Sequence, residues 1–147
     1  AHFLGCLERD HAVALDLALT LAKERGGKRA IRLAVSVAAH SPLMASAAES
    51  FGEVLKTIPF TLLLFPVIGN VSAAPLTTRD DILHELDAQI TSTVHWTQSI
   101  ETMRIMGART FLELGSKDVL TGLLRRIDKA ATGIAINSVD ALGQLAG

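Results

Sequence analysis

The histidine at position 40 stands where an enzyme would hold a base. It lies within the segment Ser36-Val37-Ala38-Ala39-His40-Ser41-Pro42-Leu43-Met44, and residues 31–36 alternate between apolar and polar or small side chains. That alternation predicts a half-buried strand, and Ser41 and Pro42 are typical of a helix N-cap and first turn. Because a free imidazole has a pKa of about 6.5, a histidine held at such a corner suits general acid–base catalysis.

A nucleophile to partner this base is missing from the sequence. The single cysteine, Cys6, lies in an apolar run with no histidine or basic residue beside it. No Gly-x-Ser-x-Gly motif, which presents a reactive serine on a strand-turn-helix elbow, occurs among the 147 residues. His40 is therefore either structural or works with a nucleophile that lies elsewhere.

Size and charge indicate one globular domain without a nucleic-acid or membrane surface. The chain has 147 residues, is 49% hydrophobic, and carries 14 basic against 15 acidic residues for a net charge of -1. This balance offers no broad electrostatic footprint for nucleic acid and no polybasic membrane signal. One basic cluster stands out, and we interpret it as a solvated helix end: Lys23, Arg25, Lys28, Arg29 and Arg32.

Cysteine and histidine usage points to a reducing compartment and to no metal. A single cysteine excludes an intrachain disulfide and favours the cytoplasm. His2, His11 and His84 share no metal-ligand spacing, so no metal site is expected. The most apolar run, residues 60–68, is too short to cross a bilayer. The chain opens on Ala1 and enters an apolar run almost at once, which leads us to expect a missing N-terminal part.

The order of expected elements is that of an α/β domain. Strands and helices alternate along the chain, which favours a largely parallel sheet because parallel strands need crossover helices. The expected helices are 10–22, 42–57, 78–89, 96–107, 119–127 and 138–145. The expected strands are 31–36, a buried extended run over 60–71, 110–114 and 133–137.

Four segments, in order and spread over nearly the whole chain, resemble the malonyl-CoA:acyl-carrier-protein transacylases and the related acyltransferase domains of fatty-acid and polyketide synthases. They are Ser36–Met44, Pro66-Val67-Ile68-Gly69-Asn70-Val71, Gln89-Ile90-Thr91-Ser92-Thr93-Val94-His95-Trp96-Thr97-Gln98-Ser99, and Phe111-Leu112-Glu113-Leu114-Gly115 running into Val119-Leu120-Thr121-Gly122-Leu123.

The resemblance implies a ping-pong transfer of a malonyl group from coenzyme A to the phosphopantetheine thiol of acyl carrier protein, through an acyl-serine and with no bound cofactor. His40 matches the catalytic histidine that exchanges a proton with the serine and the thiols. Gln89 matches the residue whose backbone carbonyl orients that histidine. Asn70 either lines the acyl pocket or forms a strand-end turn, and both interpretations stay open.

The same resemblance implies that this chain is the C-terminal half of the family's fold. Residues 1–36 would be the latter part of a ferredoxin-like small subdomain, and residues 37–147 the C-terminal part of a hydrolase-like α/β core. The family's Gly-His-Ser-Leu-Gly elbow precedes the matched region, so the N-terminal half of the same enzyme is an expected partner. The alternative is a non-catalytic half-domain that acts only by docking to a partner chain.

Two departures from the family pattern bear on specificity and loop geometry. The family's common Gly-Pro-Gly turn reads Gly115-Ser116-Lys117 here. Ala38-Ala39 replaces the bulkier pairs that often precede the histidine, which would leave more room beside the acyl group. The choice of acyl group is therefore left open.

Overall fold

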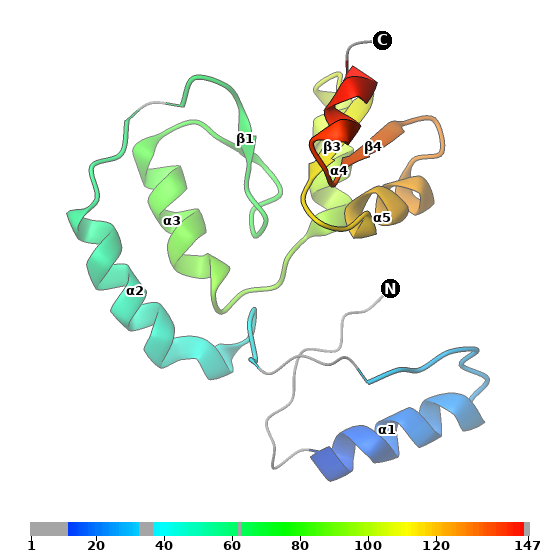
Figure 1. The fold of residues 1–147 in the computed structure, drawn as a ribbon. Coiled ribbons are helices and arrows are strands. Elements are labelled where there is room, and N and C mark those ends of the chain that lie inside the picture. Colours follow the sequence, from blue (N-terminus) through cyan, green and yellow to red (C-terminus); the bar gives the residue numbers. More distant parts are fainter. Residues whose placement is uncertain (1–11, 33–36, 62, 146–147) are drawn as a thin grey trace. The chain divides into compact units, whose positions relative to one another are not determined.

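The computed structural model describes residues 12–32, 37–61 and 63–145. Contacts within the chain divide it into two compact units, residues 1–62 with 77–94 and residues 63–76 with 95–147. Helices and strands both occur, and two of the strands are parallel, so the predicted α/β class is confirmed (Figure 1). The predicted domain division at residues 36 and 37 stays a prediction.

The first unit is helical in the part that the structure describes. Its elements are α1 (Ala12–Glu24), the 3₁₀ helix η2 (Pro42–Met44), α2 (Ala45–Thr57) and α3 (Arg79–Gln89). Gly26 and Gly27 follow the end of α1, and Gly26 lies in the left-handed region at φ 85°. Of the strand predicted over residues 31–36, residues 33–36 lie outside the described residues, and the two that are described belong to no strand.

Helices α2 and α3 pack side by side (Figure 1). Each turns an apolar side chain inward, Leu55 from α2 and Ile82 from α3, with 4% and 9% of their surface exposed. The extended Ile58 and then Pro59 end α2, because proline cannot continue a helix. The helix predicted over residues 42–57 is confirmed, with its first turn tightened into η2.

The second unit contains both strand pairs. Its elements are β1 (Val67–Ile68), β2 (Pro75–Leu76), α4 (Trp96–Ile105), β3 (Thr110–Leu114), α5 (Val119–Ile127), β4 (Thr132–Ile136) and the 3₁₀ helix η3 (Asp140–Leu145). β1 and β2 form a short antiparallel hairpin. β3 and β4 are parallel, with Thr110 opposite Thr132 and Leu114 opposite Ile136, and α5 is the crossover between them.

The core of the second unit lies between α4, α5 and the parallel strands. Ile100 and Leu124 are its most buried side chains, with 1% and 2% of their surface exposed. Gly133 of β4 lies directly against Thr121 and Leu124 of α5, where an added Cβ would overlap Thr121. This glycine therefore lets α5 approach the sheet closely.

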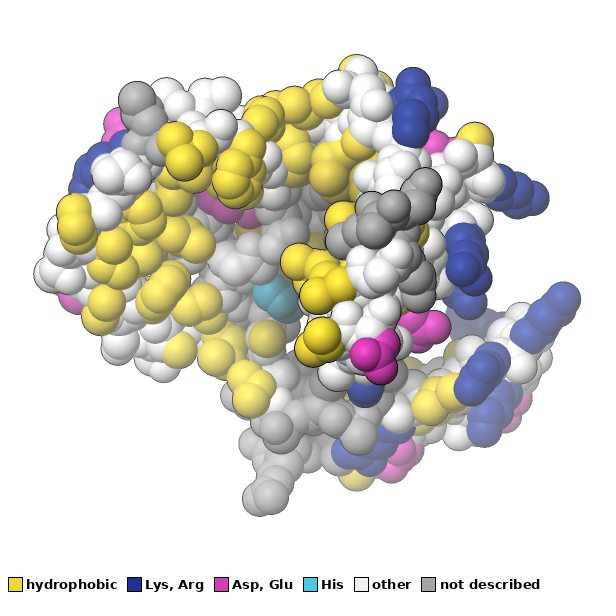
Figure 2. All heavy atoms as spheres, turned by 45° about the horizontal axis from the view of Figure 1, so that its top comes forward, with side chains coloured by type: hydrophobic (Ala, Val, Ile, Leu, Met, Phe, Trp, Pro, Cys, Tyr) yellow, Lys and Arg dark blue, Asp and Glu magenta, His cyan; other side chains and the backbone are white. Residues whose placement is uncertain are grey.

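The prediction of a buried extended run over residues 60–71 is wrong for most of its length. Among the described residues of this run, only Val67 and Ile68 form a strand, and Leu64 and Phe65 are 97% and 70% exposed. Pro66 offers no N–H for a ladder, and no described element packs over the two exposed side chains. Other hydrophobic side chains are also exposed, and Figure 2 shows many of them over the face that it draws.

Candidate active site

His40 occupies a tight turn in front of η2. Its backbone is in the left-handed region, at φ 63°, which is uncommon for a residue with a Cβ. The Ser41 hydroxyl donates to the Ala38 carbonyl at 2.8 Å and accepts from the Leu43 N–H at 3.3 Å, which closes the turn on both sides of the histidine. The His40 N–H donates to the Ile90 carbonyl at 2.8 Å, so the turn is tied to the end of α3.

The imidazole ring is held by the neighbouring carbonyl on α3. His40 Nδ1 lies 2.8 Å from the backbone oxygen of Gln89, the last residue of that helix. A carbonyl oxygen only accepts hydrogen bonds, so the proton of a neutral ring must be on Nδ1. Nε2 is then left with its lone pair. Because His40 is an exposed residue, an incoming group can reach it.

The side-chain amide of Gln89 plays no part in this assignment. Its Nε2 lies 3.4 Å from His40 Nδ1, but a ring nitrogen that already donates its proton has no lone pair to accept another. The shorter contact with the backbone oxygen therefore decides the tautomer. The predicted pairing of His40 with the Gln89 carbonyl has the geometry that a histidine-orienting role requires.

Helix α3 presents these carbonyls because both of its ends are well defined. At its start, the Thr78 hydroxyl accepts from the Asp81 N–H while Asp81 accepts from the N–H of Thr78, which forms a capping box. The backbone N–H of Thr77, then that of Thr78, and the two threonine hydroxyls lower the pKa of Asp81 to about 2. At its end, the last carbonyls have no partner inside the helix and carry partial negative charge, which suits a ring that becomes positive.

Asn70 belongs to the second unit. It lies exposed at the turn between β1 and β2, and its backbone carbonyl accepts from the His95 N–H at 2.7 Å. This bond joins the hairpin to the start of α4, and a second bond from Thr102 Oγ1 to the Ala73 carbonyl at 2.8 Å reinforces the contact. The strand-end turn is thus present, and the acyl-pocket role of Asn70 stays a prediction.

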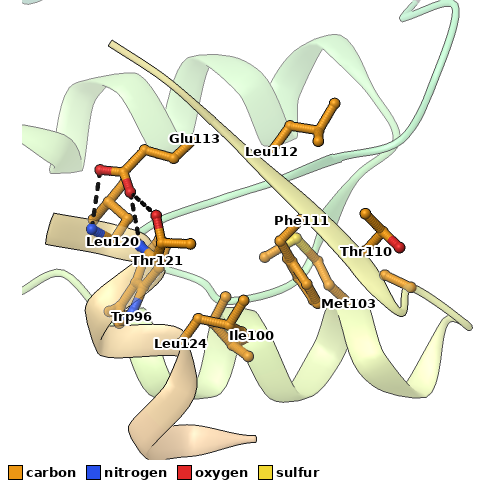
Figure 3. Close-up of a pocket in the computed structure, with 11 residues that line it drawn as sticks. Trp96, Ile100, Met103, Thr110, Phe111, Leu112, Glu113, Leu120, Thr121 and Leu124 are labelled. Atoms are coloured by element: carbon orange, nitrogen blue, oxygen red, sulfur yellow. Dashed lines mark hydrogen bonds between the residues drawn. The ribbon is translucent and has the colours of Figure 1, made fainter. Parts of the chain in front are cut away.

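Sequence reasoning missed two residues that shape these elements. Ile90 holds the backbone of His40, and its place directly after Gln89 was the only available signal. Glu113 of β3 caps α5 from outside the helix, accepting from the N–H groups of Leu120 and Thr121 at 3.0 and 2.7 Å and from the Thr121 hydroxyl (Figure 3). Partial burial raises the pKa of Glu113, but these hydrogen bonds outweigh it and leave the pKa below its ordinary value.

Neither a metal centre nor a membrane span is found in the part of the chain that the structure describes. No group of three histidine, cysteine, aspartate or glutamate residues is placed to hold a metal ion there. No described helix has the length and apolar character needed to cross a membrane.

Comparison with known proteins gives a consistent set of relatives. No protein-family model matches the chain. It is 40% identical over 131 residues to the malonyl CoA-acyl carrier protein transacylase of Bacillus subtilis, covering 89% of this chain and 41% of that protein. It is 37% identical over 132 residues to the enzyme of the same name from Escherichia coli K12, covering 90% of this chain and 43% of that protein.

Solved structures agree with these relatives. The malonyl-CoA:acyl carrier protein transacylase of Xanthomonas oryzae superposes with a TM-score of 0.84 at 34% identity, over 91% of this chain and 43% of that one. A malonyl-transacylase in complex with a type II polyketide synthase acyl-carrier protein superposes with a TM-score of 0.84 at 36% identity, over 90% and 43%. The chain thus spans less than half the length of the relatives that it matches.

Proposed function

We propose that this chain, a relative of the malonyl-CoA:acyl-carrier-protein transacylases that matches their C-terminal part, provides the general base for malonyl transfer from coenzyme A to acyl carrier protein. The observation that carries the proposal is the 2.8 Å contact between His40 Nδ1 and the Gln89 carbonyl. It leaves Nε2 as the proton acceptor, in an exposed residue. We take the two substrates, malonyl-CoA and acyl carrier protein, from the names of the relatives.

In the first half-reaction His40 activates a serine hydroxyl that the transacylase supplies from outside these 147 residues. Nε2 takes the hydroxyl proton as the serine oxygen attacks the thioester carbon of malonyl-CoA. The bond between carbon and sulfur then breaks, and the imidazolium returns the proton to the departing coenzyme A thiolate. The product is a malonyl-serine ester and free coenzyme A.

The second half-reaction runs the same proton exchange in reverse. The phosphopantetheine thiol of acyl carrier protein gives its proton to Nε2 and attacks the malonyl-serine ester. The ester bond to serine breaks, and the serine oxygen recovers the proton from the imidazolium. No metal or redox cofactor is required, because every step is a proton transfer or an acyl transfer.

The Gln89 carbonyl does for this histidine what a carboxylate does in a hydrolase triad. A neutral acceptor fixes the tautomer and the ring orientation, although it stabilises the imidazolium less than a carboxylate would. The electronegative end of α3 compensates in part. An oriented imidazole is also our reason to prefer catalysis over a module that only docks, since docking needs no such ring.

The chain by itself is expected to be inactive, because no Gly-x-Ser-x-Gly elbow occurs in its sequence. We place it in the cytoplasm on the ground that its only cysteine, Cys6, permits no intrachain disulfide.

A chimeric enzyme tests the proposal. This chain would replace the matched 131 residues of the Bacillus subtilis relative, and malonyl transfer to acyl carrier protein would be measured. His40→Ala should lower the rate of transfer by about 10²- to 10⁴-fold, as loss of a general base does. The matched control is His84→Ala, since His84 is an exposed histidine on α3. Transfer at the unsubstituted rate by the His40 variant would remove His40 from the mechanism.

A further inference from the structure

We propose that Ser41 is a positioning residue for malonyl transfer, because its hydroxyl holds the backbone of His40 in the conformation from which the ring reaches the Gln89 carbonyl. The inference rests on the proposed function, since it takes His40 as the general base. It concerns the first compact unit alone, and the hydrogen bonds of the turn around His40 carry it.

The turn that carries His40 has a conformation that a histidine does not favour. Ala39 and His40 are its two central residues, and of these His40 has the positive φ, at 63°. This is the pattern of a type II turn, whose third residue is usually glycine or asparagine because a Cβ is crowded there. Glycine cannot replace a residue that must carry the imidazole. The neighbouring groups must therefore hold the turn in place.

The Ser41 hydroxyl supports the turn from both sides of the histidine. It donates to the carbonyl of Ala38, two residues before His40, at 2.8 Å, and it accepts from the N–H of Leu43, three residues after His40, at 3.3 Å. Ser41 itself has an extended backbone, at φ -140° and ψ 159°, and is the N-cap of η2. One hydroxyl thus ties the first residue of the turn to the helix that follows, and the backbone of His40 lies between the two bonds.

This hydroxyl is the side-chain group that makes the turn specific to the sequence. The bond from the His40 N–H to the Ile90 carbonyl, at 2.8 Å, joins two backbone groups that nearly every residue type has. The neighbours of Ser41 cannot take over its role, since Ala39 has no polar side chain and Pro42 has no N–H. Replacing Ser41 therefore tests the turn without changing the ring or its acceptor.

The position of the ring depends on this backbone conformation. The other allowed regions for a residue with a Cβ have negative φ, so relaxation of His40 would turn its Cα–Cβ bond to a new direction. His40 Nδ1 lies 2.8 Å from the Gln89 oxygen, and a displacement of about 1 Å would break that hydrogen bond. The proton of the neutral ring would then no longer be confined to Nδ1. Loss of the Ser41 hydroxyl should therefore slow proton transfer and leave substrate binding unchanged.

Nitrogen-15 NMR of the His40 ring in this chain tests the positioning role without any catalysis. We expect the neutral ring of Ser41→Ala to average between its two tautomers, and that of Ser41→Thr to keep its proton on Nδ1, because threonine retains the hydroxyl and is a good N-cap. The matched control is Ser50→Ala. Its hydroxyl donates to the Ser46 carbonyl at 3.2 Å within α2, outside the turn, so the tautomer should not change.

Steady-state kinetics of the chimeric enzyme test the same variants in malonyl transfer. Ser41→Ala should lower kcat by about tenfold, as expected when one or two ordinary hydrogen bonds no longer hold the turn, and should change KM by less than about twofold. Ser41→Thr and Ser50→Ala should keep kcat within about twofold of the unsubstituted value. Ser41→Cys has a weak donor and should fall between the alanine and threonine variants, which measures the effect even where the alanine variant does not fold.

Each outcome decides the proposal. An alanine variant that keeps either the Nδ1 form of the ring or the unsubstituted kcat would overturn it, and so would a threonine variant that behaves like the alanine variant. A lower urea unfolding midpoint with no change in tautomer or kcat would show a structural role alone. If His40→Ala transfers at the unsubstituted rate, the proposed function fails, and the NMR comparison still decides whether Ser41 positions the ring. If His40→Ala is slow and Ser41→Ala is not, the proposed function stands and the role of Ser41 is refuted.

Discussion

His40 is held by two consecutive carbonyl groups at the end of α3. The Gln89 oxygen accepts a hydrogen bond from the ring Nδ1–H and the Ile90 oxygen accepts one from the backbone N–H, each at 2.8 Å. The left-handed backbone at φ 63° costs about 1 kcal/mol for a residue with a Cβ, and the two bonds offset it. Strain kept at one residue and supported by its neighbours is typical of a functional position.

Replacing the side chain of Gln89 should change little, because the backbone makes the working contact. We expect Gln89→Ala to lower malonyl transfer by the chimeric enzyme by less than about fivefold, which is under about 1 kcal/mol in the barrier. Steady-state kinetics with and without the substitution measure this. A loss as large as that of His40→Ala would show instead that the side-chain amide positions the ring.

At this scale the sequence predicted the pair but not how it is held. His40 and Gln89 were found through motifs that resemble a family, although 49 positions separate them. The role of Ile90 and the left-handed turn were missed, because a backbone carbonyl is common to every residue type. The Ile90 carbonyl is distinguished only by its position at the end of α3 in the folded structure.

At the scale of elements, the start of α3 controls how firmly its end is placed. Asp81 accepts hydrogen bonds from Thr77 and Thr78, and its pKa is lowered from 3.8 to about 2. A carboxyl group whose pKa is lower in the folded state stabilises the fold above its unfolded pKa, and this contribution disappears as the pH falls through the folded value. At low pH the capping box is therefore weakened, and with it the support that α3 gives to the position of Gln89.

Asp81→Asn should reveal that link in the pH dependence of stability. The variant is expected to be less stable than the unsubstituted chain at neutral pH, and the difference should shrink as the pH falls from 3.8 to about 2. Urea unfolding midpoints across this range measure it. Asp80→Asn is the matched control, since Asp80 lies in the same first helical turn. A difference that stays constant with pH would contradict the assignment.

The sequence predicted capped helices well and one apolar run badly. Thr78 and the glycines after α1 are local signals, and helices are present where residues 10–22 and 78–89 predict them, over Ala12–Glu24 and Arg79–Gln89. The only signal in residues 60–71 was their hydrophobicity, and hydrophobicity alone does not predict which element will pack over them. Leu64 and Phe65 are exposed because burial depends on a neighbouring element and not on the run itself.

For the whole molecule, the chain is similar to less than half of the length of each transacylase named above. It covers 41% to 43% of them, and Leu112 and Leu114 of β3 are exposed. The parallel sheet and the element order were predictable from alternating strands and helices. The short antiparallel hairpin β1–β2 was not, because neither of its two-residue strands carries a periodic pattern.

The proposed mechanism depends most on an imidazole that carries its proton on Nδ1 and keeps the lone pair of Nε2 free. Nitrogen-15 NMR of the histidine rings in this chain measures that directly, with the His40 signals assigned from the spectrum of His40→Ala. We predict that the neutral His40 ring carries its proton on Nδ1 and has an unprotonated Nε2. A protonated Nε2, or rapid averaging between the two tautomers, would contradict the role given to the Gln89 carbonyl.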